Sequence, residues 1–369
     1  MTLSEPQQAN SAPMRPCGRG GRGRQHRGSL GSGRQDVEMV TMKPRSRYPM
    51  IGALAVIMLA PWASHSAAVT EAFPGTNGKI VFVSDRDGDD EIYTMNAGRT
   101  REDVASLRQL THNSVPDRDP VFSSDGSKIA FASLRDDNWD VFTMNADGTE
   151  EARITEEASG EFQPSFAPGF SRPRQTIVFT STRDVSAREP FNHEVYRLDP
   201  ESARLAMQLT FDPELDTEPA WSPTECKIAF SSKRSSGNRD IFIMGCSGLD
   251  LRRLTTSPAS DSWPAFSPDG KKIAFQSNRS GNTDIYVMNT DGTGQERVTN
   301  DVSEEWQPAF SPDGAWIVFT SWNRLGNADI YTRRLDGTAE VRITSGPRDG
   351  VRNTQPDWQS VPSAAGGGG

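Results

Sequence analysis

Hydrophobic and polar residues alternate over short runs along most of the chain, and residues 263–299 show the pattern most clearly. Four strands of this unit are predicted at Pro264–Phe266, Lys272–Gln276, Asp284–Met288 and Gln295–Thr299. Gly, Pro, Asn and Asp separate them, as expected of tight turns and hairpin loops. A sheet of this size cannot bury both faces by itself, so the unit needs neighbours of the same kind.

The chain contains six copies of this unit. The isoleucines that open the apolar second strand lie 44 to 51 residues apart, at Ile80, Ile129, Ile177, Ile228, Ile273 and Ile317. Four strands in each repeat of this length are typical of a β-propeller blade and not of a helical solenoid. The predicted fold is therefore all-β, a six-bladed β-propeller of four-stranded antiparallel blades.

A proline two residues before an aromatic residue marks the innermost strand of each blade. The pairs are Pro120/Phe122, Pro164/Phe166, Pro219/Trp221, Pro264/Phe266, Pro308/Phe310 and Pro356/Trp358. The sixth pair lies near the C-terminus, after the last repeat. We therefore expect Gln355–Gln359 to supply the inner strand of blade one, which closes the ring and removes its open edges.

Two further sets of residues recur, an arginine after the second strand and an acid at the start of the third. The arginines are Arg86, Arg135, Arg183, Arg234, Arg279 and Arg324, and the acids are Glu91, Asp140, Glu194, Asp240, Asp284 and Asp329. Residues that recur in all six blades are expected to maintain the architecture. A salt bridge across each hairpin mouth would explain both sets.

The chain ahead of the repeats has a different composition. Residues 1–47 are Gly/Arg-rich and are predicted to be disordered. RNA binding is one interpretation of that segment; a start codon at Met42 is the other, and we favour it. Residues 48–68 are predicted to be the apolar region and cleavage site of a signal peptide. Cleavage is expected near Ala68, and an uncleaved signal anchor is the alternative. The propeller then spans 69–362, and 363–369 form a flexible tail.

Removal of the first 68 residues changes the electrostatics. The full chain has a formal charge of −9, and residues 1–68 contain nine basic and three acidic residues, so the rest has about −15. This charge argues against nucleic acid and anionic membranes as partners. We expect a monomeric, periplasmic or secreted protein.

The run PAFSPDGKKIAFQSNRSGNTDIYVMNTDG resembles the PD40, or WD40-like, repeat of TolB-type propellers. The resemblance covers residues 73–360. It implies an exported propeller that binds a protein or peptide partner, such as one of the cell envelope. Proteins of this type have an α/β domain before the propeller, which we do not expect here, so only the propeller and its export carry over.

Catalytic chemistry has little support in the sequence, and no catalytic residue is assigned. Only His112 and His193 follow the signal segment, whereas oligogalacturonate lyases with a similar repeat bind a metal through a histidine cluster. A Gly-x-Ser-x-Gly elbow is also absent. Cys226 and Cys246 lie at the open end of the hairpin of blade four, where a disulfide is expected; two free thiols are the alternative.

Residues that do not recur are the candidates for function. Acidic loops between blades are expected to gather at one face, with Phe191 and His193 from the enlarged hairpin of blade three and Trp322 from that of blade six. The acidic candidates are Asp117, Asp119, Glu161, Asp216, Glu218, Asp261, Glu304 and Glu305. This face favours a non-catalytic scaffold that binds a protein, a peptide or a cationic ligand. The alternative is a glycosidase- or lyase-type enzyme that uses carboxylates at the channel mouth.

A second candidate site is the acidic run Asp85–Glu91. Its residue types suit calcium, but its glycine stands fourth instead of sixth, so it is not an EF-hand loop. No cofactor is assigned, and calcium is held as a hypothesis for this run.

Overall fold

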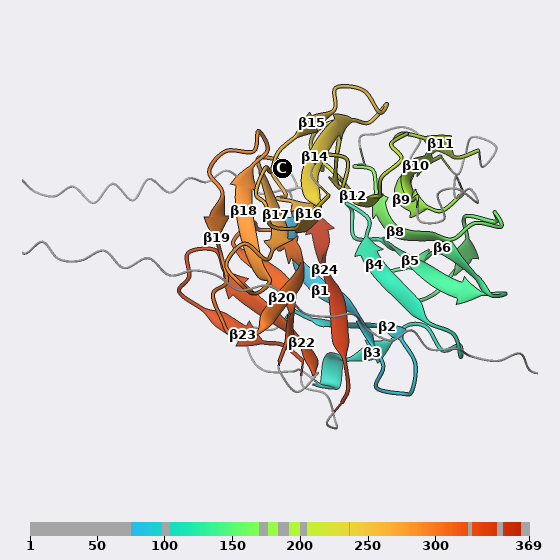
Figure 1. Cartoon of the computed structure of the whole chain (residues 1–369). Helices are drawn as coiled ribbons and strands as arrows, with labels where there is room; N and C mark the ends of the chain where they lie inside the picture. The colour runs from blue at the N-terminus through green and yellow to red at the C-terminus, as the bar shows by residue number, and fades with distance from the viewer. Residues whose placement is uncertain are drawn as a thin grey trace, which may run out of the picture. The chain divides into compact units, whose positions relative to one another are not determined.

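The computed structural model describes residues 75–97, 104–169, 176–183, 192–199, 205–235, 237–323, 327–344 and 350–362. These residues form six four-stranded antiparallel sheets (Figure 1). No membrane-spanning helix is found among them. The predicted disorder, signal peptide and tail lie outside the described residues.

Each sheet is one blade, with strands in sequence order from the channel outward except in blade one. Blade one comprises β24 (Asn353–Pro362), β1 (Gly75–Ser84), β2 (Glu91–Asn96) and β3 (Arg108–Gln109), with η1 (Val104–Ser106) before β3. Blade two comprises β4 (Asp117–Phe122), β5 (Lys128–Arg135), β6 (Asn138–Asn145) and β7 (Ala152–Arg153). Blade three comprises β8 (Glu161–Phe166), β9 (Ile177–Ser181), β10 (Glu194–Leu198) and β11 (Met207–Gln208).

The remaining blades repeat the same plan. Blade four comprises β12 (Asp216–Trp221), β13 (Lys227–Ser232), β14 (Asp240–Gly245) and β15 (Arg252–Arg253). Blade five comprises β16 (Asp261–Phe266), β17 (Lys272–Ser277), β18 (Asp284–Asn289) and β19 (Glu296–Arg297). Blade six comprises β20 (Glu304–Phe310), β21 (Trp316–Trp322), β22 (Ala328–Arg334) and β23 (Glu340–Arg342).

The ring closes as the prolines predict. Strand β24 pairs antiparallel with β1, with Trp358 opposite Ile80, and Figure 1 shows the two strands side by side. The two ends of the propeller thus share one sheet, and β1 is not left as an open edge of that sheet.

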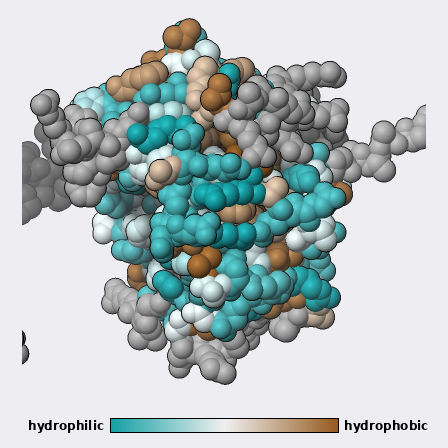
Figure 2. Space-filling view, turned by 90° about the vertical axis from the view of Figure 1, so that its right-hand side faces the viewer, coloured by the Kyte–Doolittle hydropathy of each residue, from teal (hydrophilic) through white to brown (hydrophobic). Residues whose placement is uncertain are grey.

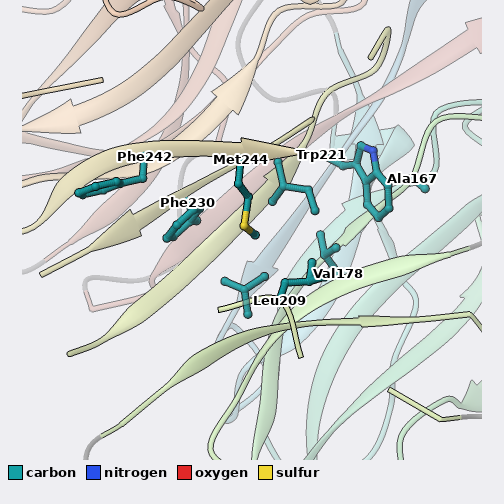
Figure 3. Close-up of a cluster of buried hydrophobic side chains, with 9 residues drawn as sticks. Ala167, Val178, Leu209, Trp221, Phe230, Phe242 and Met244 are labelled. Atoms are coloured by element: carbon teal, nitrogen blue, oxygen red, sulfur yellow. The ribbon is translucent and has the colours of Figure 1, made fainter. Parts of the chain in front are cut away.

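The hydrophobic core lies between neighbouring blades. Where blades three and four meet, Val178 and Leu209 contact Trp221, Phe230 and Met244 (Figure 3). In every blade a second-strand phenylalanine stacks on a third-strand Phe or Tyr, with ring centroids 5.7–6.2 Å apart. Full burial of one such side chain contributes about 1.5–3 kcal/mol.

The predicted salt bridge between each arginine and the third-strand acid is wrong in blades two to five. Arg183, Arg234 and Arg279 instead bind the acids that open the first strand of their own blade, namely Glu161, Asp216 and Asp261 respectively. Arg135 binds Glu151, and Arg86 of blade one donates to Asn353. Arg324 lies outside the described residues.

The position of each guanidinium group explains why these arginines do not pair with the third-strand acids. These arginines stack over the aromatic pair of their own blade, as Arg279 does over Tyr286 at 4.7 Å. The Nε group of each donates to the serine that ends the second strand, for example Ser277 (2.8 Å). In blades three, four and five, this position leaves the Nη2 group to bind the acid of the inner strand.

The third-strand acids bind a different arginine. In blades two, four, five and six, an arginine of the fourth strand provides the counter-charge, in the pairs Arg153–Asp140, Arg253–Asp240, Arg297–Asp284 and Arg342–Asp329. The acids are buried, so the arginines neutralise charges that water cannot reach.

Cys226 and Cys246 flank β13 and β14 and form a disulfide in the structure, with Cα atoms 5.1 Å apart. The Cys246 N–H also donates to the Cys226 carbonyl (3.0 Å). The bond therefore ties the open end of this hairpin.

One side of the propeller is seen in Figure 2. Its described surface is mainly hydrophilic, and hydrophobic residues appear there as small separate areas.

Candidate binding site at the central channel

Six residues line the channel at the same position of each inner strand, directly before the proline. All six have left-handed backbones, with φ between 53° and 59°. We call them the channel girdle: Asp119, Gln163, Glu218, Trp263, Gln307 and Gln355. A β-bulge accompanies each of them. Such backbone conformations cost of order 1–3 kcal/mol each and persist where neighbours hold them in place.

Hydrogen bonds from blade to blade hold the girdle. The N–H of each girdle residue donates to a side-chain oxygen of the preceding blade at 3.0–3.2 Å. In five of the six cases, the acceptor belongs to the preceding girdle residue. Gln355, for example, accepts from Asp119, and Asp119 accepts from Gln163. The girdle is thus a closed circuit that fixes each inner strand to its neighbour.

Blade five is the exception, because the indole of Trp263 cannot accept a hydrogen bond. Gln276, on the second strand of that blade, replaces it and accepts from the Gln307 N–H at 3.0 Å. This substitution keeps the circuit closed and leaves the Trp263 side chain as part of the channel wall.

On one side of the girdle, the channel encloses a cavity of about 420 Å³. Its walls are mostly apolar, formed by the channel prolines and the aromatic residues two positions after them. Asp357 lies within this wall and accepts from the Phe122 N–H at 2.7 Å. Burial raises the pKa of Asp357 and that of the girdle residue Asp119 to about 6.

On the other side of the girdle lies a second cavity of about 700 Å³, which we call the mouth cavity. Gln307 and Gln355 line both cavities. The remaining wall of the mouth cavity comes from blades one, two, five and six: Asp90, Arg118, Asn282, Val302, Glu304, Trp306, Trp322, Asn323, Arg352 and Thr354.

Two tryptophans and an exposed valine make part of the mouth cavity apolar. Val302 is 78% exposed, and Trp306 and Trp322 are half-buried. The Trp306 Nε1–H is buried and has no hydrogen-bond acceptor among the described residues. A ligand that offers an acceptor and an apolar group would therefore complete this wall.

The charges of the mouth cavity are only partly balanced. Arg118 binds Asp90 at 2.6 Å, and Arg352 binds Asp85 at 2.7 Å and Asp90 at 3.5 Å. Glu304 is exposed and has no salt bridge with any described residue. The cavity can therefore accept a cation near Glu304.

The structure separates the residues of the predicted acidic face into a buried group and a group that lies closer to the channel. Asp117, Glu161, Asp216, Asp261 and Glu305 are almost fully buried at the start of their strands. Three of them bind arginine, as described above, and Asp117 accepts from Asn113 at 2.7 Å. Burial and neighbouring acids raise the pKa of Glu305 to about 8. These five are not part of a solvated acidic mouth.

The other predicted residues are closer to the channel. Asp119 and Glu218 belong to the girdle, and Glu304 and Trp322 line the mouth cavity. His193 is half-buried against the edge of Phe162, with ring centroids 5.4 Å apart. Burial and Arg239 lower the pKa of His193. Phe191 lies outside the described residues.

Sequence reasoning missed most of the channel wall. Trp306, Gln307 and Asp357 lie beside the recurring channel prolines, and sequence reasoning assigns recurring features to the architecture. The position before each proline does vary among Asp, Gln, Glu and Trp. That variation was the available signal for side chains that face a channel.

Comparison with known proteins supports the same reading of the fold. Residues 258–363 match the family model described as the TolB beta propeller domain. The ring is a TolB-like β-propeller. A comparison with curated protein sequences found no match.

Solved structures similar to the TolB-like propeller include two TolB proteins. TolB from Acinetobacter baumannii is 22% identical, with a TM-score of 0.63 over 76% of this chain and 66% of its own, just under two thirds. A putative TolB from Agrobacterium tumefaciens is 17% identical, with a TM-score of 0.56 over 78% of this chain and 100% of its own.

An enzyme is among the similar structures as well. Oligogalacturonate lyase from Vibrio parahaemolyticus is 16% identical, with a TM-score of 0.50 over 75% of this chain and 78% of its own. Identities this low establish a shared fold. The function therefore has to be inferred from the residues that line the channel.

Proposed function

We propose that this TolB-like propeller is a non-catalytic scaffold that binds a protein or peptide segment with a basic side chain in the mouth cavity. The observation that carries the proposal is the combination of Trp306, Trp322 and Glu304 around one cavity of about 700 Å³, where Glu304 has no salt bridge with any described residue. Tryptophans in a pocket are common anchors of protein–protein contacts.

The chemistry of the wall suits a lysine or arginine. A cation can pair with Glu304 and also lie over an indole face, which attracts positive charge. The Trp306 Nε1–H can donate to a main-chain carbonyl of the same segment. Arg118 and Arg352 do not oppose this, because Asp85 and Asp90 already neutralise them.

The channel carboxylates support a scaffold more than an enzyme. Asp119 accepts from Gln355 Nε2 and the Gln163 N–H, and Glu218 accepts from Arg239, Ser231 and the Trp263 N–H. These oxygens hold the girdle together and are not free to act on a substrate.

The raised pKa values of Asp119 and Asp357 are the observation that favours the alternative, a lyase- or glycosidase-type enzyme. An oligogalacturonate lyase shares the fold. If the Asp119→Asn and Asp357→Asn variants lost a hydrolytic or lyase activity toward an oligosaccharide, the enzyme would replace the scaffold as our conclusion.

Export belongs to the same proposal. The apolar segment at residues 48–68 and the disulfide of blade four both suit a compartment outside the cytoplasm. A periplasmic or secreted propeller would meet its partner in the cell envelope or beyond it. Mass spectrometry of the exported protein under non-reducing conditions would test both the cleavage site and the disulfide.

Selection from a random peptide library tests the binding proposal. We expect selected peptides to be rich in lysine or arginine next to an apolar residue. Binding should weaken at least tenfold in Trp322→Ala and in Glu304→Gln. Leu249→Ala is the matched control, because Leu249 is 68% exposed but lies in the outer hairpin of blade four, away from the mouth cavity. Undiminished binding by both cavity variants would contradict the proposal.

A further inference from the structure

Blade one lacks the arginine that neutralises the third-strand acid in four other blades. That arginine stands two residues before the threonine that ends the repeat, and blade one has Gln109 at this position. The acid itself, Glu91, is retained. Blade one therefore keeps a buried carboxyl group while its usual counter-ion is replaced by a neutral amide.

The environment of Glu91 provides little compensation. Its side chain is 0% exposed, and neither carboxylate oxygen has a hydrogen-bond partner among the residues that the structure describes. A buried carboxyl group without a partner is costly to ionise, and a cation beside it would offset that cost.

Two more carboxylates lie beside Glu91. Oxygens of Asp87, Asp89 and Glu91 all lie within 4.8 Å of one another. Asp89 Oδ2 is buried and also has no hydrogen-bond partner, whereas Asp87 is exposed and leaves an approach from solvent. Gln109 Nε2 donates to Asp87 Oδ2, so the residue that replaced the arginine now positions the outermost carboxylate.

We propose that Asp87, Asp89 and Glu91 bind a calcium ion at the hairpin mouth of blade one, in the role that an arginine has in other blades. Ca²⁺ takes six to eight oxygen ligands with flexible geometry, so three carboxylates and several waters suffice. Mg²⁺ demands a smaller, near-octahedral shell and releases water reluctantly, which favours calcium at a site of loosely spaced carboxylates.

Blade three provides an internal comparison, because Gln208 also replaces the arginine there. The acid of that blade, Glu194, accepts from Asn192 Nδ2 at 3.2 Å and from the Thr210 hydroxyl. No group of three acids close enough to hold a metal surrounds Glu194 among the described residues. Loss of the arginine therefore leads to ordinary hydrogen bonds in blade three and to an acidic cluster in blade one.

Calcium titration of the full chain, freed of metal with a chelator, tests the proposal. We expect one binding event in isothermal titration calorimetry, with Kd roughly 10⁻⁴ to 10⁻³ M as in extracellular calcium modules. The midpoint of thermal unfolding should rise by several degrees in about 10 mM Ca²⁺, because the ion binds only the folded state. Equal Mg²⁺ should produce a smaller rise.

Three variants decide where the ion binds. Asp87→Asn and Glu91→Gln should abolish both the heat of binding and the thermal shift, and Glu194→Gln should retain them. Asp87 is exposed, so its variant tests binding even where Glu91→Gln alters the fold. The proposal is overturned if the wild type shows no calcium response, or if Asp87→Asn and Glu91→Gln respond as the wild type does.

Discussion

A single residue position in each blade, directly before the channel proline, decides how the inner strands are joined. Five side chains at that position accept a hydrogen bond from the next blade, and Gln276 does so for the sixth. Glutamine and carboxylate oxygens both perform this task, with donor–acceptor distances of 3.0–3.2 Å. The carboxylates differ from glutamine because a carboxyl group can ionise. Their contribution to stability therefore depends on pH.

Asp357 provides the prediction at this scale. Burial raises its pKa in the folded protein to about 6, above the ordinary value of 3.8. Its ionisation therefore lowers stability as the pH rises from about 4 to above 6. In Asp357→Asn, the amide oxygen can still accept from Phe122, but no charge forms. We expect the variant to match the wild type near pH 4 and to exceed it by on the order of 1–3 kcal/mol above pH 6.

Urea unfolding of both proteins between pH 4 and pH 7 measures this difference. The wild type should lose stability across that interval relative to the variant. A constant difference at all pH values would mean that Asp357 titrates normally and that the channel wall is well solvated.

At the scale of the element, the hairpin mouths of blades four and five each contain two acids and two arginines held in a fixed order. The arginine after the second strand reaches inward to its own first strand, and the arginine of the fourth strand covers the acid of the third. The short fourth strands have few backbone pairs, such as the two of β19 with β18. Their ion pairs therefore help to keep the outer edge of the blade in place.

Arg297 tests this arrangement. Arg297→Met leaves Asp284, which is 0% exposed, without its counter-charge. We expect a loss of about 2–4 kcal/mol, because one partner of a buried pair remains charged. The double variant Arg297→Met/Asp284→Asn should recover part of this loss. Equal stability of the single and double variants in urea unfolding would show that Asp284 does not depend on the arginine.

At the scale of the whole molecule, the ring depends on a strand supplied from the far end of the chain. Strand β24 pairs with β1 along its length, and Trp358 packs in the core between blades one and six. Girdle residue Gln355 lies on the same strand and contacts blades two and six through hydrogen bonds. Closure of the ring and closure of the girdle are therefore one event.

Truncation tests this dependence. Deletion of residues 353–369 should abolish a single cooperative unfolding transition, or lower its midpoint by more than about 10 °C, because β1, β4, β20, β21 and β22 all lose their contacts with β24. Deletion of 363–369 alone is the control and should leave the midpoint unchanged. A cooperative, undiminished transition in the longer truncation would show that the blades are stable as an open array.

The repeat length, the four strands of each blade and the closing strand were determined by the sequence alone. They depend on local patterns, namely alternation, turn residues and a proline two residues before an aromatic, and each pattern occurs six times. Only the tertiary structure decided which arginine meets which acid, because those partners are on different strands and the stacking of each guanidinium on its aromatic pair selects between them. The girdle and the mouth cavity likewise arise only when six blades face one axis, and no single repeat contains that information.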